Sequence, residues 1–296
     1  MKCLLRVVTF AVAAPLCGLL AHQPIMDMAP RWAGGYGFQL RQVWYGSNDL
    51  LAGSSELTNP NAVSRHVRQT WLEGVYTFNR AVRVTAKLPY LDKERTVLSG
   101  GVPLAQEVAG LGDLVLAAPL KKYRNLTRYT DNFGLTPQLR LPTGDADGPY
   151  ALSDGSWDLG LSLSYSGEGF VFERLPSLNF YQLYDLFHWQ NRKGKDGLEE
   201  GDLWGLDVNL GAKLYDDADT LTGAFLMWDF SWRRQETGDA RTDAYAGESV
   251  HTGPVLVWYR ENLMARAEWK FAARERRFTE GVAKGDVFEL GVGFSF

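Results

Sequence analysis

The last eleven residues of the chain, 286–296, alternate strictly between two kinds of side chain. The apolar positions are Phe288, Leu290, Val292, Phe294 and Phe296. Because successive side chains of a β-strand point to opposite faces, one face of this segment is wholly apolar. A chain that ends on an aromatic residue of that face is typical of the closing strand of a bacterial outer-membrane barrel. An edge strand of a soluble sheet is the alternative, since alternation alone is common.

The same alternation recurs through the chain, for example over residues 82–90, 157–165, 204–214 and 263–273. These runs exceed the roughly five or six residues of a typical soluble strand. About ten residues, tilted by about 45°, cross the core of a bilayer. Run length and alternation together favour strands that span a membrane.

The turns and runs predict an all-β fold, a transmembrane antiparallel up-and-down β-barrel of about 12 strands. The expected strands are 35–45, 65–78, 81–91, 110–121, 129–141, 156–165, 170–185, 203–215, 220–233, 249–259, 263–275 and 286–296. Short and long connections alternate, and an even strand number puts both termini in the periplasm. Pro176 interrupts the segment 170–185, which predicts a kink and a lateral gap there.

The beginning of the chain reads as an export signal. Lys2 and Arg6 precede an apolar run over residues 7–21 that is short for a membrane-spanning helix. We expect a signal peptide over 1–21, a short periplasmic segment over 22–34 and the barrel over 35–296. Cys3 and Cys17 both fall inside the signal, and lipidation at Cys17 is the alternative to simple cleavage after Ala21.

Composition excludes several classes of protein. The net charge is −4 and no basic patch dominates, so nucleic acid is not an expected partner. Hydrophobic residues make up 45% of the chain, and no later segment has the length of a spanning helix. A soluble all-β domain and a transmembrane barrel remain.

Assigning the apolar face of each strand to lipid sends the polar face inward. An Arg or Lys on the lipid face at the bilayer midplane would cost about 2–4 kcal/mol. The expected lumen-lining residues are Arg41, Glu73, Arg83, Lys87, Asp113, Gln138, Arg140, Asp158, Asp207, Asn209, Lys213, Asp229, Arg233, Arg266, Glu268, Lys270 and Glu289. Their mixed signs predict ion pairs in the lumen and argue against a pore dedicated to anions or cations.

Aromatic residues near the expected kink suggest a path for an apolar solute. Trp189, on an expected external loop, would meet the solute first. Tyr181, Tyr184 and Phe187 would pass it onward.

Three segments, residues 84–90 (VTAKLPY), 110–114 (GLGDL) and 139–145 (LRLPTGD), occur in this order. In them the chain resembles the outer-membrane family named for the meta pathway of phenol degradation, distant relatives of the long-chain fatty-acid and aromatic-hydrocarbon channels. The resemblance implies a barrel that takes up small, often apolar compounds. The fatty-acid channels are plugged by an N-terminal segment, for which residues 22–34 are too short. Locally, Gly110 and Gly112 permit a bulge and Pro142 ends a strand.

We therefore expect a passive outer-membrane channel for small, apolar or aromatic molecules, with no enzymatic activity, cofactor or metal. One alternative is a closed structural or assembly barrel without flux, which a lumen packed with ion pairs would favour. The other is a barrel-embedded hydrolase using His251 beside Ser249 or His66 beside Ser64. The expected partners are outer-membrane lipid and lipopolysaccharide, the barrel-assembly machinery that would read Phe296, and a small apolar solute.

Overall fold

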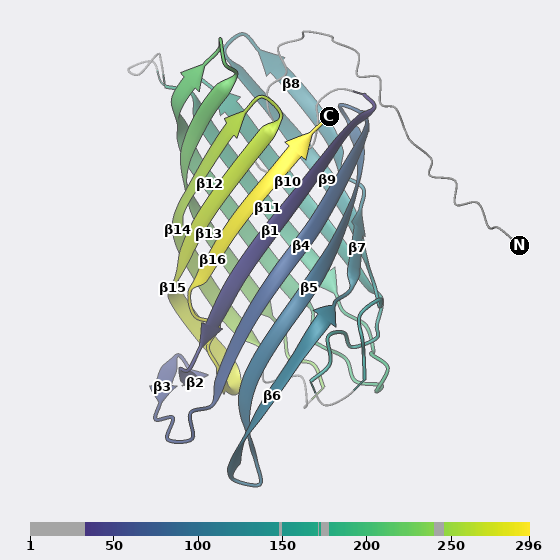
Figure 1. Cartoon of the computed structure of the whole chain (residues 1–296), viewed down its shortest axis with the longest axis vertical. Coiled ribbons are helices and arrows are strands. Elements are labelled where there is room, and N and C mark those ends of the chain that lie inside the picture. Colours follow the sequence, from purple (N-terminus) through teal and green to yellow (C-terminus); the bar gives the residue numbers. More distant parts are fainter. Residues whose placement is uncertain (1–32, 148–149, 171, 173–177, 240–245) are drawn as a thin grey trace, which may run out of the picture.

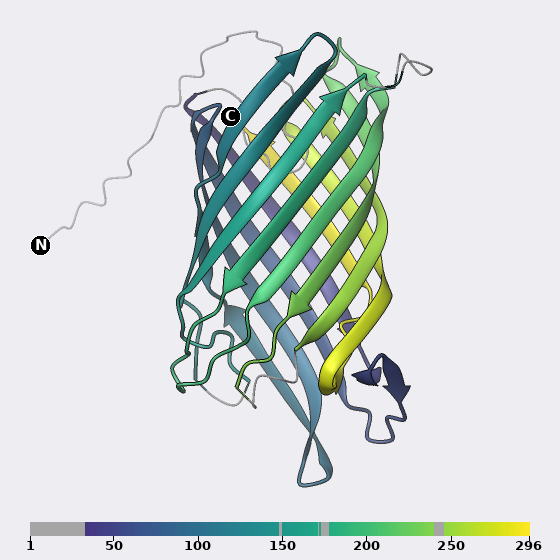
Figure 2. The same ribbon diagram turned by 180° about the vertical axis from the view of Figure 1, so that it is seen from behind.

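The computed structural model describes residues 33–147, 150–170, 172, 178–239 and 246–296, and its strands form one closed antiparallel sheet (Figures 1 and 2). Eleven barrel strands are continuous: β1 (Gly35–Ser47), β4 (Ser64–Asn79), β5 (Val82–Ser99), β9 (Tyr129–Leu141), β10 (Asp158–Gly169), β11 (Phe180–Gln190), β12 (Leu203–Asp217), β13 (Thr222–Gln235), β14 (Gly247–Arg260), β15 (Leu263–Val282) and β16 (Val287–Ser295). One more is made of three pieces, β6 (Val102–Leu111), β7 (Leu114–Ala117) and β8 (Leu120–Leu126). The predicted barrel of 12 antiparallel strands is confirmed. A small hairpin, β2 (Leu50–Gly53) and β3 (Ser55–Leu57), is additional.

The barrel closes where the last strand meets the first. β16 pairs with β1 from Gly37 opposite Ser295 to Tyr45 opposite Val287. The amide of Phe296 then donates to the carbonyl of Tyr36 at 2.7 Å. The start of β1 and the end of β16 lie at the upper end of Figure 1, here called the terminal end, and the opposite end is called the loop end.

The strand made of β6, β7 and β8 is the irregular part of the wall. β6 pairs only with β5, β7 joins β5 to β9, and β8 pairs with β9 but makes a single pair, Leu120 with Val82, to β5. The first break falls at Gly112 and Asp113. The second falls at Ala118 and Pro119, where proline has no N–H to donate to the ladder.

The expected strand 170–185 is wrong. Its counterpart is β11, which begins at Phe180, and the preceding strand β10 runs on to Gly169. Residues 166–169 look like a turn by composition, but Gly167 pairs within the sheet with Asp131 and Gln182. Glycine is required there because a Cβ would approach the Tyr129 hydroxyl to 1.8 Å. The ring of Tyr129 takes the space that a side chain would need. The kink expected at Pro176 lies outside the described residues.

Segments expected as long loops also contain strand. β5 extends to Ser99 and turns through Gly100 and Gly101, both with positive φ, into β6, so much of 92–109 is a hairpin that projects beyond the loop end (Figure 1). β15 similarly continues to Val282. The lengths of β5 and β15 were underestimated because the projecting parts of these strands lose the strict apolar alternation.

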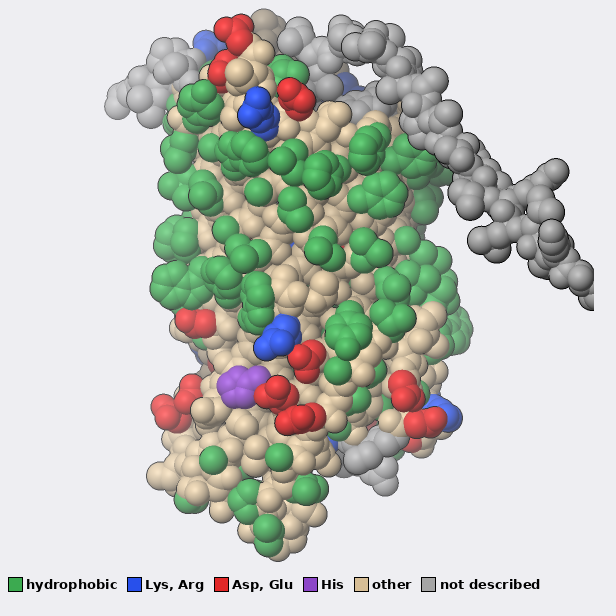
Figure 3. Space-filling view, viewed as in Figure 1, with side chains coloured by type: hydrophobic (Ala, Val, Ile, Leu, Met, Phe, Trp, Pro, Cys, Tyr) green, Lys and Arg blue, Asp and Glu red, His purple; other side chains and the backbone are tan. Residues whose placement is uncertain are grey.

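The outer wall carries the predicted apolar belt. Leu40, Leu72, Leu161, Leu163 and Leu290 are all exposed on it. Figure 3 shows apolar side chains across the middle of the visible face, with charged side chains gathered toward the two ends. Within the described residues, no helix has the length and apolar character needed to cross a membrane. The expected signal peptide and nearly all of the segment 22–34 lie outside the described residues.

Candidate functional site

The inside of the barrel holds nearly all of the residues expected to line it. Alternation and register give the direction: Leu40 and Leu290 are exposed on the outer wall, so Arg41 and Glu289, one residue along each strand, point inward. The same parity places the other expected lumen residues on the inner face of their strands. Asp113, in the break between β6 and β7, has a different role described below.

A line of ion pairs runs around the middle of the lumen. It is centred on Arg41, whose guanidinium lies 2.7 Å from Glu73 on β4 and 3.0 Å from Glu289 on β16. Lys87 on β5 extends it through a 3.4 Å contact with Glu73. Arg266 on β15 continues it in the other direction, 3.6 Å from Glu289. Five neighbouring strands, from β5 through β4, β1 and β16 to β15, are thus joined across the closing seam by side chains as well as by the backbone ladder.

The line continues from β15 across β14. Glu268 is 1% exposed and contacts both Arg266 and Lys270, the latter at 2.5 Å. Lys270 also reaches Asp229 on β13 at 2.9 Å. Gly253 on β14 is the partner of Asp229 in the register, so the ammonium group passes over a position without a side chain. Charges that would each be costly to bury alone are therefore paired.

Further polar contacts lie beyond β13 along the wall. Ser231 donates to Asp207 at 2.7 Å and to Asp229 at 2.8 Å, and Arg233 contacts Asp207 at 2.8 Å. Farther round, Arg140 contacts Asp158 at 2.9 Å. The prediction of ion pairs in the lumen corresponds to these contacts, which link neighbouring strands along the wall.

Nearer the terminal end, one side of the lumen is apolar. The inward side chains there pack into one cluster, called here the apolar strip: Tyr181, Phe225, Met227, Val255, Val257, Tyr259 and Met264, with Leu183 beside it. Phe225 and Met227 are 1% and 2% exposed. This strip was not predicted, although residues 224–228 and 255–259 are apolar throughout, which indicates strands with two apolar faces.

The four expected path residues divide between the two faces. Tyr181, Phe187 and Trp189 point inward from β11, whereas Tyr184 faces outward and is paired with the outward Tyr165. Trp189 is part of β11 and not of a loop. The expected continuous path through all four residues is therefore wrong, because the strand was placed several residues too early and Tyr184 has the opposite parity from the other three.

Phe187 and Trp189 on β11 each lie against a cation from two strands away, Arg233 on β13 and Arg140 on β9. The guanidinium carbon of Arg233 is 4.7 Å from the Phe187 ring centroid, and that of Arg140 is 4.7 Å from the Trp189 ring. A Cβ at Gly205, the partner of Phe187, would come within 2.2 Å of that ring, so the ring lies flat on the wall. This part of the lumen presents stacked cation and ring surfaces.

Residues 110–114 and 139–145 dock onto each other at the broken strand. The Asp113 carboxylate accepts hydrogen bonds from the Gly144 amide at 3.0 Å and the Ser153 hydroxyl at 2.9 Å. Thr143 donates to the Gly112 carbonyl at 3.1 Å and accepts from the Leu114 amide at 2.9 Å. Asp113 thus holds the loop 142–157 against the edge of the strand, a role that the expected lumen lining did not include.

Two other expected residues lie toward the terminal end. Arg83 is buried and donates to the Tyr123 hydroxyl at 3.0 Å. Lys213 lies over the rings of Phe225 and Tyr259, at 5.3 and 5.7 Å, and contacts Asp216 at 3.2 Å. Both cations are therefore held at the wall beside aromatic groups.

Lys284, in the connection between β15 and β16, turns into the mouth of the lumen, 5.1 Å from the ring of Tyr45. Burial, together with the nearby cations Arg233 and Lys270, lowers its pKa to about 7, although Glu275 acts in the opposite sense. Because this pKa lies below that of an unfolded lysine, the folded chain binds fewer protons. The free energy of unfolding should then rise with pH from about 7 to about 10.5.

We expect the charge on Lys284 to appear in the mouth as the pH falls through about 7. If ions pass, the reversal potential measured across a planar bilayer in a salt gradient should shift toward anion preference between about pH 8 and pH 6. Lys284→Met should remove that shift, whereas Lys195→Met, at an exposed loop lysine, should keep it. An unchanged pH response in Lys284→Met would contradict the assignment.

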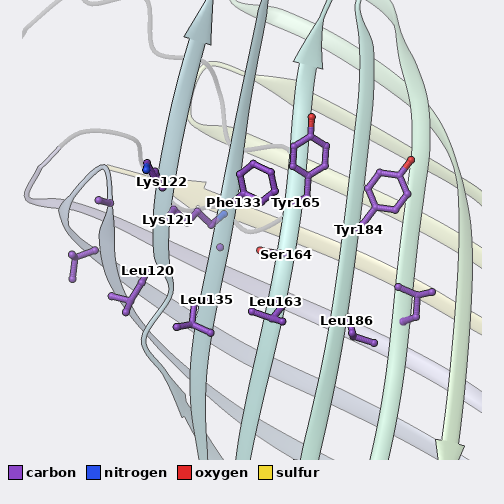
Figure 4. A pocket seen from close by; sticks show the side chains of 14 residues that line it. Leu120, Lys121, Lys122, Phe133, Leu135, Leu163, Ser164, Tyr165, Tyr184 and Leu186 are labelled. Atoms are coloured by element: carbon purple, nitrogen blue, oxygen red, sulfur yellow. The ribbon is translucent and has the colours of Figure 1, made fainter.

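A groove lies on the outer wall, away from the lumen (Figure 4). One side is a row of leucines that are direct partners across neighbouring strands: Leu120, Leu135, Leu163, Leu186 and Leu206. The other side has Phe133, Tyr165 and Tyr184, with Lys122 at the end of the row. Its position on the apolar outer wall separates this groove from the lumen.

The histidines expected for a hydrolase have other contacts. His251 is buried, and its Nε2 lies 3.0 Å from the Gly285 carbonyl and 3.3 Å from Glu275. His66 faces outward and contacts Asn48 at 3.1 Å. His251 thus connects β14 to Glu275 on β15 and to the connection that contains Gly285, and His66 connects β4 to Asn48. In the part of the chain that the structure describes, no group of three or more His, Cys, Asp or Glu residues is arranged to hold a metal ion.

A closed antiparallel barrel with an apolar outer belt and an ion-paired interior defines the class of outer-membrane β-barrel proteins. Residues 52–283 match the family described as "Putative MetA-pathway of phenol degradation". The match covers most of the chain, and the protein belongs to this family. The resemblance seen in residues 84–145 is thereby confirmed.

Solved structures show the same fold at low sequence identity. An outer membrane channel from Pseudomonas putida F1 is similar with a TM-score of 0.66 and 15% identity, over 89% of this chain and 96% of that one. The beta domain of the Bordetella autotransporter BrkA is similar with a TM-score of 0.51 and 15% identity, over 89% of this chain and 100% of that domain. No curated protein matches the sequence. A channel and an autotransporter beta domain thus share this architecture, so the likeness to solved structures shows the fold, and the family match shows the family.

Proposed function

We propose that the protein is a passive channel of the bacterial outer membrane for small, apolar or aromatic molecules. The observation that carries the proposal is the apolar strip. The inner face of a membrane barrel is ordinarily polar, yet Phe225, Met227 and Val255 face the lumen. The family name, which refers to phenol degradation, supports a solute of this chemical class.

Two kinds of surface follow one another along the lumen, from the loop end to the terminal end. Near the loop end, Phe187 and Trp189 lie flat beneath guanidinium groups and present ring faces and edges. Near the terminal end, the apolar strip continues on the same side of the barrel, with Tyr181 on β11 joining the two regions. A phenol-like molecule, with an apolar ring and one hydroxyl, matches such a lining because its ring can move along the apolar side while its hydroxyl contacts the polar side.

The ion pairs favour a second function, a closed barrel without flux. Arg41, Glu73 and Glu289 link three strands across the seam, and Lys270 crosses β14 to reach Asp229. Such contacts stiffen the wall, and side chains that meet over the lumen also narrow it. A structural or assembly role needs these contacts, and it also fits the close packing of the apolar strip, in which Phe225 and Val255 are 1% and 0% exposed.

Uptake measurements separate the two functions. In cells with an intact lipopolysaccharide leaflet, expression of the protein should raise the initial uptake of radiolabelled phenol several-fold, and purified protein should give current steps in planar bilayers. Phe225→Ala should change the initial rate of phenol uptake. Leu226→Ala, at the adjacent lipid-facing position, should leave that rate unchanged. Absence of both current and added uptake would establish the closed barrel instead.

We also propose that the terminal end faces the periplasm and the loop end faces outward, as the loop lengths favour. Contact with lipopolysaccharide and recognition of Phe296 by the barrel-assembly machinery stay predictions. Phe296 is 61% exposed beside the seam, which leaves its ring accessible. Accessibility of single cysteines placed at Gly100 and Asp219 to an impermeant thiol reagent on intact cells tests the orientation.

A further inference from the structure

Three exposed arginines gather on the outer wall near the loop end of β13 and β15. Arg234 on β13 and Arg276 on β15 are both partners of Glu248, which lies between them on β14. Arg274 is the partner of Val250 in the neighbouring row. Their positions alternate with inward residues, so all three side chains point away from the lumen. They are called here the arginine patch.

Like charges are held close together in this patch. The guanidinium carbons of Arg234 and Arg276 lie 5.6 and 5.9 Å from the centroid of the same ring, Phe278. Glu248 is the carboxylate nearest in the register, and it also accepts a hydrogen bond from the Trp232 indole at 2.7 Å. In the two neighbouring rows of the register, Arg234, Arg274 and Arg276 face the single carboxylate of Glu248, so these rows have an excess of positive charge, while Glu236, Glu280 and Asp286 lie outside them. The Phe278 ring holds Arg234 and Arg276 in place, and a bound anion would balance the excess charge of the patch.

The patch lies just beyond the apolar belt. Phe230 on β13 and Phe271 on β15 are exposed on the outer wall, between the patch and the middle of the barrel. Arg234 follows Phe230 by four residues, which is about 13 Å along a strand and about 9 Å along the membrane normal at a tilt of about 45°. Aromatic girdles mark the interface, so the arginines reach the level of the headgroups.

We propose that the arginine patch binds the phosphate groups of a phosphorylated glycolipid of the outer leaflet, the lipid A part of lipopolysaccharide. Arginine forms paired hydrogen bonds with phosphate, and the excess charge of the patch matches a lipid with more than one phosphate. The acyl chains of the lipid would lie on Phe230, Phe271 and Trp228, which are exposed on the side of the patch that faces the middle of the barrel. The inference depends on the loop end facing outward and is independent of whether the barrel conducts.

Binding of lipid A to the purified full-length protein in nanodiscs tests the proposal. Diphosphoryl lipid A should bind specifically, and Arg274→Ala with Arg276→Ala should weaken that binding by at least about tenfold through loss of charge-assisted contacts. Monophosphoryl lipid A should bind the unchanged protein more weakly than the diphosphoryl form. Arg68→Ala is the matched control, since Arg68 is an exposed arginine near the loop end of β4 that has its own carboxylate, Asp92, at 3.4 Å.

Three outcomes would overturn the proposal: equal binding by the double variant, equal binding of the two lipids, or an equal loss in Arg68→Ala. The gel mobility of unheated and heated samples shows whether each variant is folded. Arg274→Lys with Arg276→Lys keeps the charge and loses the paired geometry, so it should recover part of the affinity. Loss of lipid binding with phenol uptake retained would separate this site from the channel.

Discussion

Glu268→Ala should destabilise the barrel by about 3 kcal/mol, the lower end of the cost of breaking a buried ion pair, because it removes the carboxylate that two buried cations share and leaves Lys270 with Asp229 and Arg266 with Glu289. Glu268 is 1% exposed and contacts both Arg266 and Lys270. The side chain lies in the middle of the lumen, where little water is available to replace it. Urea-induced unfolding in lipid vesicles, followed by tryptophan fluorescence, measures the change in the free energy of unfolding.

Two variants make the result specific. Glu268→Gln keeps the size and one acceptor, so its effect should be smaller than that of alanine. Glu280→Ala removes an exposed carboxylate from the same strand and should change stability by less than about 0.5 kcal/mol. A Glu268→Ala variant as stable as the Glu280→Ala variant would show that the lumen charges are solvated rather than mutually dependent.

Asp113→Ala should release the loop 142–157 from the broken strand. The carboxylate accepts two hydrogen bonds from this loop, and each bond to a charged group is worth about 1.5–3 kcal/mol. Local opening should therefore become at least about tenfold more frequent. Chymotrypsin, which cuts after Tyr150 or Leu152, should cleave folded Asp113→Ala correspondingly faster than the unchanged protein.

Asp147→Ala is the control for this loop. Asp147 pairs with Lys195 at 2.6 Å, but both side chains are well exposed, so the pair contributes little. Its removal should leave the cleavage rate near that of the unchanged protein. Equal cleavage of Asp113→Ala and Asp147→Ala would mean that the loop is held by its apolar contacts, such as the buried Leu152.

The sequence predicted the wall of the barrel well because one physical rule governs it. Side chains that meet hydrocarbon must be apolar, so strands such as β1 and β16 show strict alternation, and their lumen charges follow by elimination. The rule fails where both faces are apolar, and for that reason the strip containing Phe225 and Val257 was not anticipated. It fails again at Gly167, where the ring of Tyr129 replaces a side chain and a strand looks like a turn.

The role of Asp113 illustrates a different limit. Its type and its place after two glycines were visible in the sequence, but its partners Gly144 and Ser153 lie 31 and 40 residues away. The alternation along one strand determines the face on which a side chain lies. It does not determine which loop folds back to contact that side chain. The pairing of residues 110–114 with 139–145 therefore required the three-dimensional structure.

The uneven pairing around the wall has a mechanical consequence. The seam between β1 and β16 is reinforced by Arg41 and Glu289, whereas β5 meets β7 and β8 through only a few residue pairs. Lateral pressure from the bilayer would therefore deform this cylinder unequally. The stiff side contains the closure of the chain, and the compliant side contains the segmented strand, so shape changes imposed by the surrounding lipid would be concentrated between β5 and β9.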